Sequence, residues 1–356
     1  MPATASRMSR SRAMAADGPR LDGKFWLADA PDRQVFGTLD LSGRWPVVRL
    51  VEPLTPSLMV ADRQPAMDGS VVVTHVPAPM GPQVERHLVH GRLHGEQNEL
   101  TLLDCFTTRR GNGQHLQAAY ALVGGHVTGD LLVSRVRVRL LHLDRWAHLG
   151  GLSTSFSGSG ERAEVRFARP DSPSAAVPGR GLRLTLDVVP TLRESDSDMT
   201  ASIAESTWLR LDYLPSVQLD IVWQHISGLA TLLALATDAA VWPIALEIID
   251  SMPPGSRLQV RDPRIRPGAP ERRARSLLLS RPELDLEHLA TWLTTYDKLR
   301  PIPSLVAAAI DPPVRMLEAG LLELAIAAEG LHRRLDPTAT ALKTTWFILL
   351  WVDLAS

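Results

Sequence analysis

The pair of side chains best suited to chemistry is a carboxylate and an imidazole near the C-terminus. Glu329 and His332 are three residues apart in a stretch whose apolar positions recur at helical spacing. Side chains at this spacing lie on one face of a helix, where a carboxylate and an imidazole can share a proton or form a polar pocket. Glu329 and His332 are therefore our candidate catalytic residues. The alternative is a solvated pair, or a pair within a dimer interface.

The segment 261–275 is the one strongly basic patch, in which prolines and a glycine separate the arginines. Because a guanidinium can bind phosphate through two parallel hydrogen bonds, this segment is a candidate RNA-binding site. The candidate nucleic-acid-binding residues are Arg264, Arg266, Arg272 and Arg273. No aromatic residue lies between these arginines, which disfavours stacking on single-stranded bases. The alternative is a solvated loop.

Three histidines, His87, His90 and His94, invite comparison with a metal site. On a strand that rises about 3.3 Å per residue, His90 and His94 are about 13 Å apart and His87 faces the other way. Such side chains cannot share one ion. The sequence also lacks zinc-ligand spacings, a glycine-rich phosphate loop and a dinucleotide fingerprint, so we expect neither a metal ion nor a cofactor.

The elements that must position these residues begin with a hairpin over residues 84–106. Two apolar arms flank the polar turn Gly95–Asn98, a pattern typical of paired strands. Strict alternation along the second arm places Cys105 on the same face as Thr101 and Leu103. Since Cys105 lies among apolar neighbours, we expect a buried thiol that serves the core and is not a nucleophile.

Strand-like segments and turn signals alternate about every 8–12 residues as far as Gly150, the spacing of a β-sandwich or barrel. Further on, Arg169–Arg180 is predicted to be a loop, and Val217–Thr237 an amphipathic helix capped by Ser216. The last helix is predicted over Val314–Leu335. The fold class is therefore α+β, with an N-terminal antiparallel β-sandwich-like domain, a mixed β and helical segment, and C-terminal helices.

The predicted boundaries follow from the same pattern. We expect a disordered tail over residues 1–20 and a large N-terminal domain over 21–310. That domain divides into a β-rich part, 21–150, and a mixed part, 151–310. Two prolines at Asp311–Pro313 then separate a helical region over 314–356.

Composition narrows the function classes. Lys and Arg number 38 against 39 Asp and Glu, so no overall field attracts nucleic acid or an anionic membrane. A hydrophobic content of 45% is enough for a sizeable core. A single cysteine fits a reducing cytoplasm. The most apolar run, Trp346–Val352, is about a third of the ~20 residues that span a bilayer, so we expect a cytoplasmic protein without a membrane partner.

Several short motifs, spread in order over residues 23–335, together resemble one known family. They are Gly23–Leu27, Gly37–Leu39, His90–Leu93, Thr101–Phe106, Leu143–Trp146, Leu235–Thr237, Trp242–Ile244, Trp292–Pro301 and Ala328–Leu335. The chain resembles ApeA-like antiphage defence proteins, which join a β-rich N-terminal domain to a C-terminal HEPN domain. Ala328–Leu335 is similar to the first helix of that HEPN domain.

This resemblance implies a bacterial protein of abortive infection, in which the N-terminal domain senses or regulates and the HEPN domain cuts RNA. It implies as partners a phage-derived trigger, RNA and a second copy bound through the C-terminal helix. The alternative is a non-catalytic β module that binds a ligand or a phage protein.

HEPN ribonucleases use an Arg-x(4 to 6)-His motif on a later helix. Matches to this spacing at Arg109 and His115, Arg137 and His142, and Arg281 and His288 fall in a glycine turn, on a strand and across a proline loop. Residues 314–356 are too few for a four-helix bundle with helices of about 11–12 residues. We therefore expect an incomplete, truncated HEPN region, in which a frameshift is one explanation, and no enzyme activity in the chain as it stands.

Overall fold

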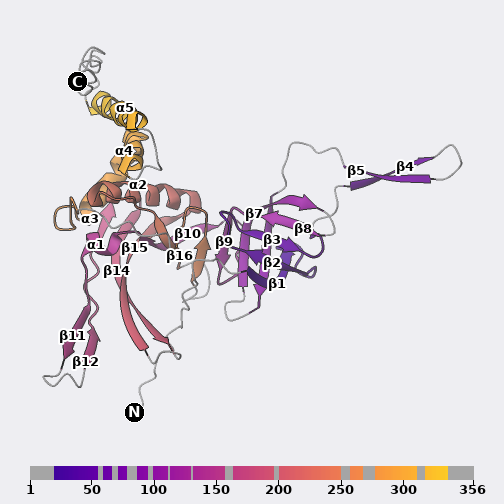
Figure 1. Ribbon diagram of the computed structural model, residues 1–356, viewed down its shortest axis with the longest axis horizontal. Helices are drawn as coiled ribbons and strands as arrows, with labels where there is room; N and C mark the ends of the chain where they lie inside the picture. Colours follow the sequence, from indigo (N-terminus) through magenta and orange to yellow (C-terminus); the bar gives the residue numbers. More distant parts are fainter. Residues whose placement is uncertain are drawn as a thin grey trace. The chain divides into compact units, whose positions relative to one another are not determined.

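A computed structural model of the chain separates into two compact units. It describes residues 20–54, 59–65, 71–77, 86–94, 99–110, 113–129, 131–156, 163–195, 200–249, 257–267, 277–310 and 317–335. The first unit holds the chain up to Gly129 together with Arg257–Pro263. The second unit holds most of the remainder, including Arg264–Arg266. Figure 1 shows the elements of each unit.

The first unit is an antiparallel β-barrel. Its strands are β1 (Arg20–Leu27), β2 (Val35–Asp40), β3 (Val47–Leu50), β6 (His87–Leu93), β7 (Glu99–Arg110), β8 (Gln114–Gln117), β9 (Tyr120–Val123) and β17 (Leu258–Arg261). The order β7-β6-β1-β2-β3-β8 closes on itself because β8 also pairs with β7. β9 and β17 continue the sheet from the other half of β7. A separate two-stranded sheet joins β4 (Met59–Pro65) and β5 (Val71–Pro77).

The interior of the barrel is apolar, as alternation along the strands requires. Phe25, Leu39, Val89, Leu100 and Leu102 have no exposed surface. Burying such a side chain stabilises the fold by roughly 1.5–3 kcal/mol.

The hairpin predicted over residues 84–106 is present, with a bulge that the sequence pattern did not show. The register between β6 and β7 shifts so that His87 faces Cys105 while Val89 faces Leu102. Asp104 occupies the left-handed region at φ 53° and is exposed. The extra residue turns Cys105 into the core that holds Leu102. Placing Cys105 on the face of Thr101 was therefore wrong, whereas its burial is confirmed.

The second unit contains an open antiparallel sheet in the order β13-β14-β15-β10-β16. Its strands are β13 (Ser174–Val177), β14 (Leu182–Ser195), β15 (Thr200–Gln218), β10 (Leu132–Leu140) and β16 (Pro243–Ile248). A small hairpin of β11 (Leu152–Phe156) and β12 (Ala163–Phe167) belongs to the same unit. Core residues alternate along the strands, as in Leu182, Leu184 and Leu186.

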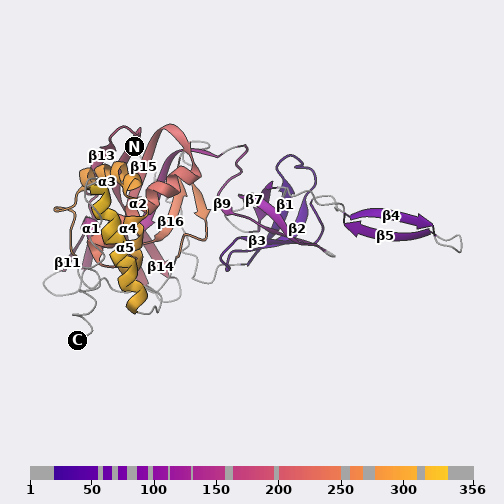
Figure 2. The same cartoon turned by 90° about the horizontal axis from the view of Figure 1, so that it is seen from above.

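All the helices that the structure describes belong to the second unit. They are α1 (Leu143–Ala147), α2 (Leu219–Thr237), α3 (Leu286–Leu299), α4 (Ile302–Ile310) and α5 (Leu317–Leu335). In Figure 1, α2 lies across one face of the sheet, and α4 and α5 follow one another away from it. Figure 2 shows these helices from above. α3 packs against α2 and also contacts β13 and β14.

Helix α2 is long and apolar enough to cross a membrane by length and composition. Of its most apolar window, 67% is buried inside the molecule, which is the environment of a core helix. The helix begins at Leu219 with Gln218 as its N-cap and ends at Asp238, which adopts φ 46°. The prediction that Ser216 caps the helix was wrong, because β15 continues as far as Gln218.

The α+β class with an N-terminal antiparallel β domain is confirmed, and the β domain is a closed barrel. The predicted loop over Arg169–Arg180 was wrong, because it contains the edge strand β13. Prolines at 170, 173 and 178 limit this strand to four residues and obscure its pattern. The final helix is confirmed from Leu317 to Leu335.

Candidate functional site

A turn just before α3 fixes one arginine beside the edge of the second unit's sheet. The backbone N–H and hydroxyl of Ser280 donate to the Glu283 carboxylate, at 2.7 and 2.9 Å. These bonds lower the pKa of Glu283. Within this turn, the backbone N–H of Arg281 donates to the carbonyl of Trp146, and its Nε donates to the carbonyl of Ala147 at 3.0 Å. Arg281 is thereby held against the end of α1.

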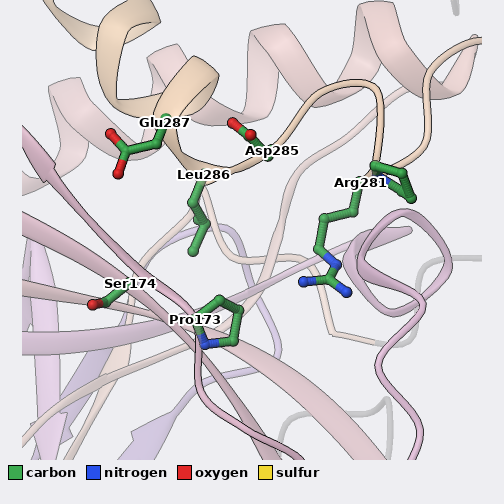
Figure 3. Close-up of a pocket in the computed structure, with 7 residues that line it drawn as sticks. Pro173, Ser174, Arg281, Asp285, Leu286 and Glu287 are labelled. Atoms are coloured by element: carbon green, nitrogen blue, oxygen red, sulfur yellow. The ribbon is translucent and has the colours of Figure 1, made fainter.

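The cavity next to Arg281 has a volume of about 410 Å³. It is lined by Pro173, Ser174, Arg281, Pro282, Asp285, Leu286 and Glu287. Figure 3 shows the guanidinium of Arg281 reaching down to the level of Pro173, while Asp285 and Glu287 lie above, at the start of α3. The volume is in the range of sites that bind small molecules.

The charged side chains around this cavity differ in how many hydrogen bonds they already form. Asp285 is the N-cap of α3: its Oδ1 accepts hydrogen bonds from the backbone N–H of His288 at 3.0 Å and from His288 Nδ1 at 2.9 Å. The backbone bond is the largest cause of the lowered pKa of Asp285. By contrast, Nη1 and Nη2 of Arg281 have no hydrogen bond or ion pair with any residue in the described ranges.

The cavity thus offers an anchored cation with two amino groups left to bind a ligand. A carboxylate or a phosphate is the usual complement of such a fork. Two prolines and Leu286 supply apolar walls. The chemistry that fits is recognition of a group that carries one negative charge next to apolar atoms.

A second cluster fixes the turn that follows β13. His225 on α2 is 3.2 Å from the Tyr213 hydroxyl through Nδ1 and 3.4 Å from Arg180 through Nε2. Because a guanidinium can only donate, Nε2 accepts and the imidazole proton is on Nδ1. Arg180 also donates to Asp297 of α3 at 2.7 Å. Burial, and then the charge of Arg180, lowers the pKa of His225 to about 4.

His90, one of the three histidines considered for a metal site, has ordinary partners in the barrel. His90 is buried; its Nε2 is 2.9 Å from the Val127 carbonyl, and its ring stacks on that of His126 at 4.6 Å. His126 in turn bonds the Gly91 carbonyl at 3.1 Å. The stacked pair therefore holds the segment after β9 against β6. Within the described ranges, no three His, Cys, Asp or Glu side chains are arranged to hold a metal ion.

Two of the four arginines predicted to bind RNA are within the described residues, and both contact tryptophan. The guanidinium of Arg264 lies 4.1 Å from the ring centroid of Trp223, and that of Arg266 lies 5.9 Å from that of Trp242. Both arginines are also exposed. In general, an arginine can stack on an aromatic face and also form hydrogen bonds through the edge of its guanidinium. Arg272 and Arg273 lie outside the described residues.

The structure places Glu329 and His332 on α5 without bringing them together through a hydrogen bond. Glu329 accepts from Arg333 at 2.5 Å, one turn further along the helix. His332 is exposed. The structure thus gives Glu329 an ion pair of the usual i, i+4 kind.

One comparison with known proteins identifies the family. The model described as ApeA N-terminal domain 1 matches residues 20–254. This chain belongs to that family. No curated protein and no solved structure matches the chain. The match to the ApeA N-terminal domain covers the described barrel strands except β17 and the whole sheet of the second unit, including the edge strand β13.

Sequence reasoning did not find the cavity at Arg281 or the cluster around His225. Both unite residues that are far apart in the chain, and neither has a local motif. The edge strand had no clear signal either, because Ser174–Val177 alternates in burial but not in residue type.

Proposed function

We propose that this protein acts in bacterial antiphage defence as the sensing or regulatory part of a HEPN ribonuclease system. The observation that carries the proposal is the match to the ApeA N-terminal domain over residues 20–254, about two-thirds of the chain. The cavity at Arg281 supports a sensing role, because its anchored cation has amino groups available to a ligand. The proposed location is the cytoplasm, where phage components are made.

The proposal extends to the C-terminal helix. α5 exposes Leu321, Leu322, Leu324, Ile326 and Leu331 in the described part of the chain. A bundle helix of a HEPN domain has such an apolar surface, and we propose that α5 is the first helix of a HEPN-like region and a contact between two copies. In this scheme Glu329 and His332 are candidate polar residues of the bundle, and the predicted domain limits remain part of the proposal.

RNA is the proposed target of the system, and a phage-derived molecule is its proposed trigger. The exposed arginines Arg264 and Arg266 support a contact with phosphate, and Arg272 and Arg273 are proposed from the sequence to share this role.

The test is phage plating on the host bacterium with the locus intact or with codons 20–254 deleted in frame. We expect at least one phage in a broad panel to plate more efficiently on the deletion strain, and complementation by the intact gene to reverse the effect. If every phage plates equally on both strains, the defence function is wrong.

A second candidate function is a non-catalytic module that binds a phage protein. The cavity at Arg281, next to an open strand edge, favours it. Analysis of host RNA from infected cells distinguishes the two candidate functions. Cleavage of host RNA that depends on the locus supports the ribonuclease system, whereas protection with intact RNA supports the binding module.

A further inference from the structure

Strand β13 forms one open edge of the second unit's sheet. Among the described strands it pairs with β14 alone, with Ser174 opposite Thr185 and Val177 opposite Leu182. The Leu186 N–H donates to the Pro173 carbonyl at 3.0 Å. This bond identifies Pro173 and Leu186 as a hydrogen-bonded pair, and such pairs alternate along an antiparallel ladder. Ser174 and Ala176 therefore direct their N–H and C=O groups away from β14.

The exposure of the side chains agrees with an edge whose one face is covered. Ala175 and Val177 are buried, at 2% and 3% exposure, on the side that contacts α3, whereas Ser174 and Ala176 are exposed. The edge is also held in place, because the turn after β13 carries Arg180, which bonds His225 on α2 and Asp297 on α3. A preorganised edge costs little conformational entropy on binding.

The cavity at Arg281 begins where this edge begins. Pro173 and Ser174 line the cavity and lead directly into β13. In Figure 3 the side chains of Arg281 and Leu286 both descend toward Pro173. The outward-facing backbone groups of β13 thus lead directly to the anchored guanidinium of Arg281, whose two amino groups are free within the described ranges. We refer to these groups together as one path.

We propose that this path binds an extended peptide. The peptide adds as a strand to β13, exchanging backbone hydrogen bonds with Ser174 and Ala176. A carboxylate of the peptide binds Nη1 and Nη2 of Arg281, and a neighbouring apolar side chain packs against Pro173, Pro282 and Leu286. Addition of a strand to a sheet edge is a general mode of peptide recognition, in which the backbone provides affinity and adjacent pockets provide specificity.

A peptide fits this surface better than a nucleic acid. Alternating N–H and C=O groups at strand spacing are complementary to another polypeptide backbone. A polyanion would meet one guanidinium and, on the same cavity, the carboxylates of Asp285 and Glu287, so only a single negative charge is matched. This inference deepens the sensing role and rests on it for the biological meaning of the peptide, while the binding itself is measured on the purified protein.

The experiment starts from a synthetic mixture of random octapeptides, from which the full-length protein selects binders that are identified by mass spectrometry. The tightest peptide is then labelled for fluorescence polarisation. Ala176→Pro removes the outward N–H without removing a hydrogen bond to β14, because proline is tolerated on the solvent side of an edge strand. Ala176→Val is the matched control, which keeps the N–H at the same exposed site.

We expect wild type and Ala176→Val to bind alike and Ala176→Pro to bind at least about tenfold more weakly. We also expect replacement of the peptide's acidic residue by its amide to weaken binding to wild type about tenfold, but to leave binding to Arg281→Gln unchanged. Arg281→Lys should restore part of the preference for the acid.

Absence of any selected peptide, or equal binding by Ala176→Pro and Ala176→Val, overturns the proposal. If Arg281→Gln still binds the acidic peptide more tightly than its amide, Arg281 does not bind the peptide carboxylate. If the peptide-binding tests fail but phage plating still depends on the locus, the peptide site is wrong and the proposed defence function is unaffected. If the peptide binds selectively but the locus has no effect on plating, the site is supported and the defence function is wrong.

Discussion

Protonation of His225 should selectively destabilise the second unit of the protein. His225 is 8% exposed and is packed between Tyr213, with ring centroids 5.8 Å apart, and Arg180. Burial first, and then the positive charge of Arg180, lowers its pKa to about 4 from an ordinary 6.5, while Asp297 opposes the shift. In the folded protein the imidazole is therefore neutral at any pH well above 4.

The direction of the pH effect follows from proton binding. Between about pH 6.5 and pH 4 the unfolded chain holds more protons at this site than the folded chain, so the free energy of unfolding rises with pH in that window. The contribution is fully present above pH 6.5 and is lost as the pH falls through the folded pKa. One pKa unit is about 1.4 kcal/mol; the largest effect is therefore about 3 kcal/mol, and solvent screening reduces it toward about 2 kcal/mol.

The assay is urea unfolding of wild type and His225→Gln at several pH values between 7 and about 4.5. Helical circular dichroism follows the second unit, since all described helices belong to it. The variant loses the bonds to Tyr213 and Arg180 and should be less stable at pH 7 by a fixed amount. As the pH falls to about 4.5, the gap in the free energy of unfolding between the two proteins should narrow by up to about 2 kcal/mol. Parallel curves would refute the assignment of a neutral, buried His225.

Three further predictions concern glycines and arginines. Gly179 and Gly181 share one turn, at φ 69° and 56°, but a Cβ at Gly181 would collide with the Leu214 carbonyl, whereas one at Gly179 meets nothing within 4 Å. In thermal unfolding, Gly181→Ala should therefore destabilise the protein by about 1–3 kcal/mol more than Gly179→Ala does. Equal losses of stability in the two variants would contradict this packing. In the barrel, a Cβ at Gly91 would lie 2.9 Å from the fully buried Phe25 ring, so Gly91→Ala should cost about 1–3 kcal/mol, and an unchanged melting temperature would count against this register. Replacing Arg264, Arg266, Arg272 and Arg273 by Ala should weaken RNA retention in filter binding. It should also lower the slope of log binding constant against log salt concentration by about 0.7 for each phosphate that the protein no longer neutralises. Unchanged binding would show that these arginines do not form an RNA-binding surface.

Local pattern was enough to predict the central hairpin and the long helix, and the reasons are visible in single residues. The hairpin of β6 and β7 has two apolar arms around a polar turn, and α2 shows apolar residues such as Val222, Ile226 and Leu229 at helical spacing. These signals are local. Closure of the barrel was not predictable, because it depends on β8 pairing with both β3 and β7.

The misses have equally specific causes. A two-residue periodicity assumes regular strands, and Asp104 breaks that assumption by adopting a left-handed backbone in a bulge. β13 is short, poor in large apolar residues and bounded by prolines, so its composition favoured a loop. The Arg281 cavity and the His225 cluster arise only when the turn before α3, the edge of the sheet and helix α2 meet in the folded unit.

The most direct test of the sensing role is phage plating on isogenic bacteria that carry the wild-type gene, Ala176→Val, Ala176→Pro or the deletion of codons 20–254. We predict that at least one phage plates poorly on wild type and on Ala176→Val, and plates on Ala176→Pro as efficiently as on the deletion strain, with equal protein levels in the three expressing strains. A phage that Ala176→Pro restricts as strongly as wild type would contradict sensing through the β13 edge. If no phage distinguishes wild type from the deletion, antiphage defence is not the function of this protein.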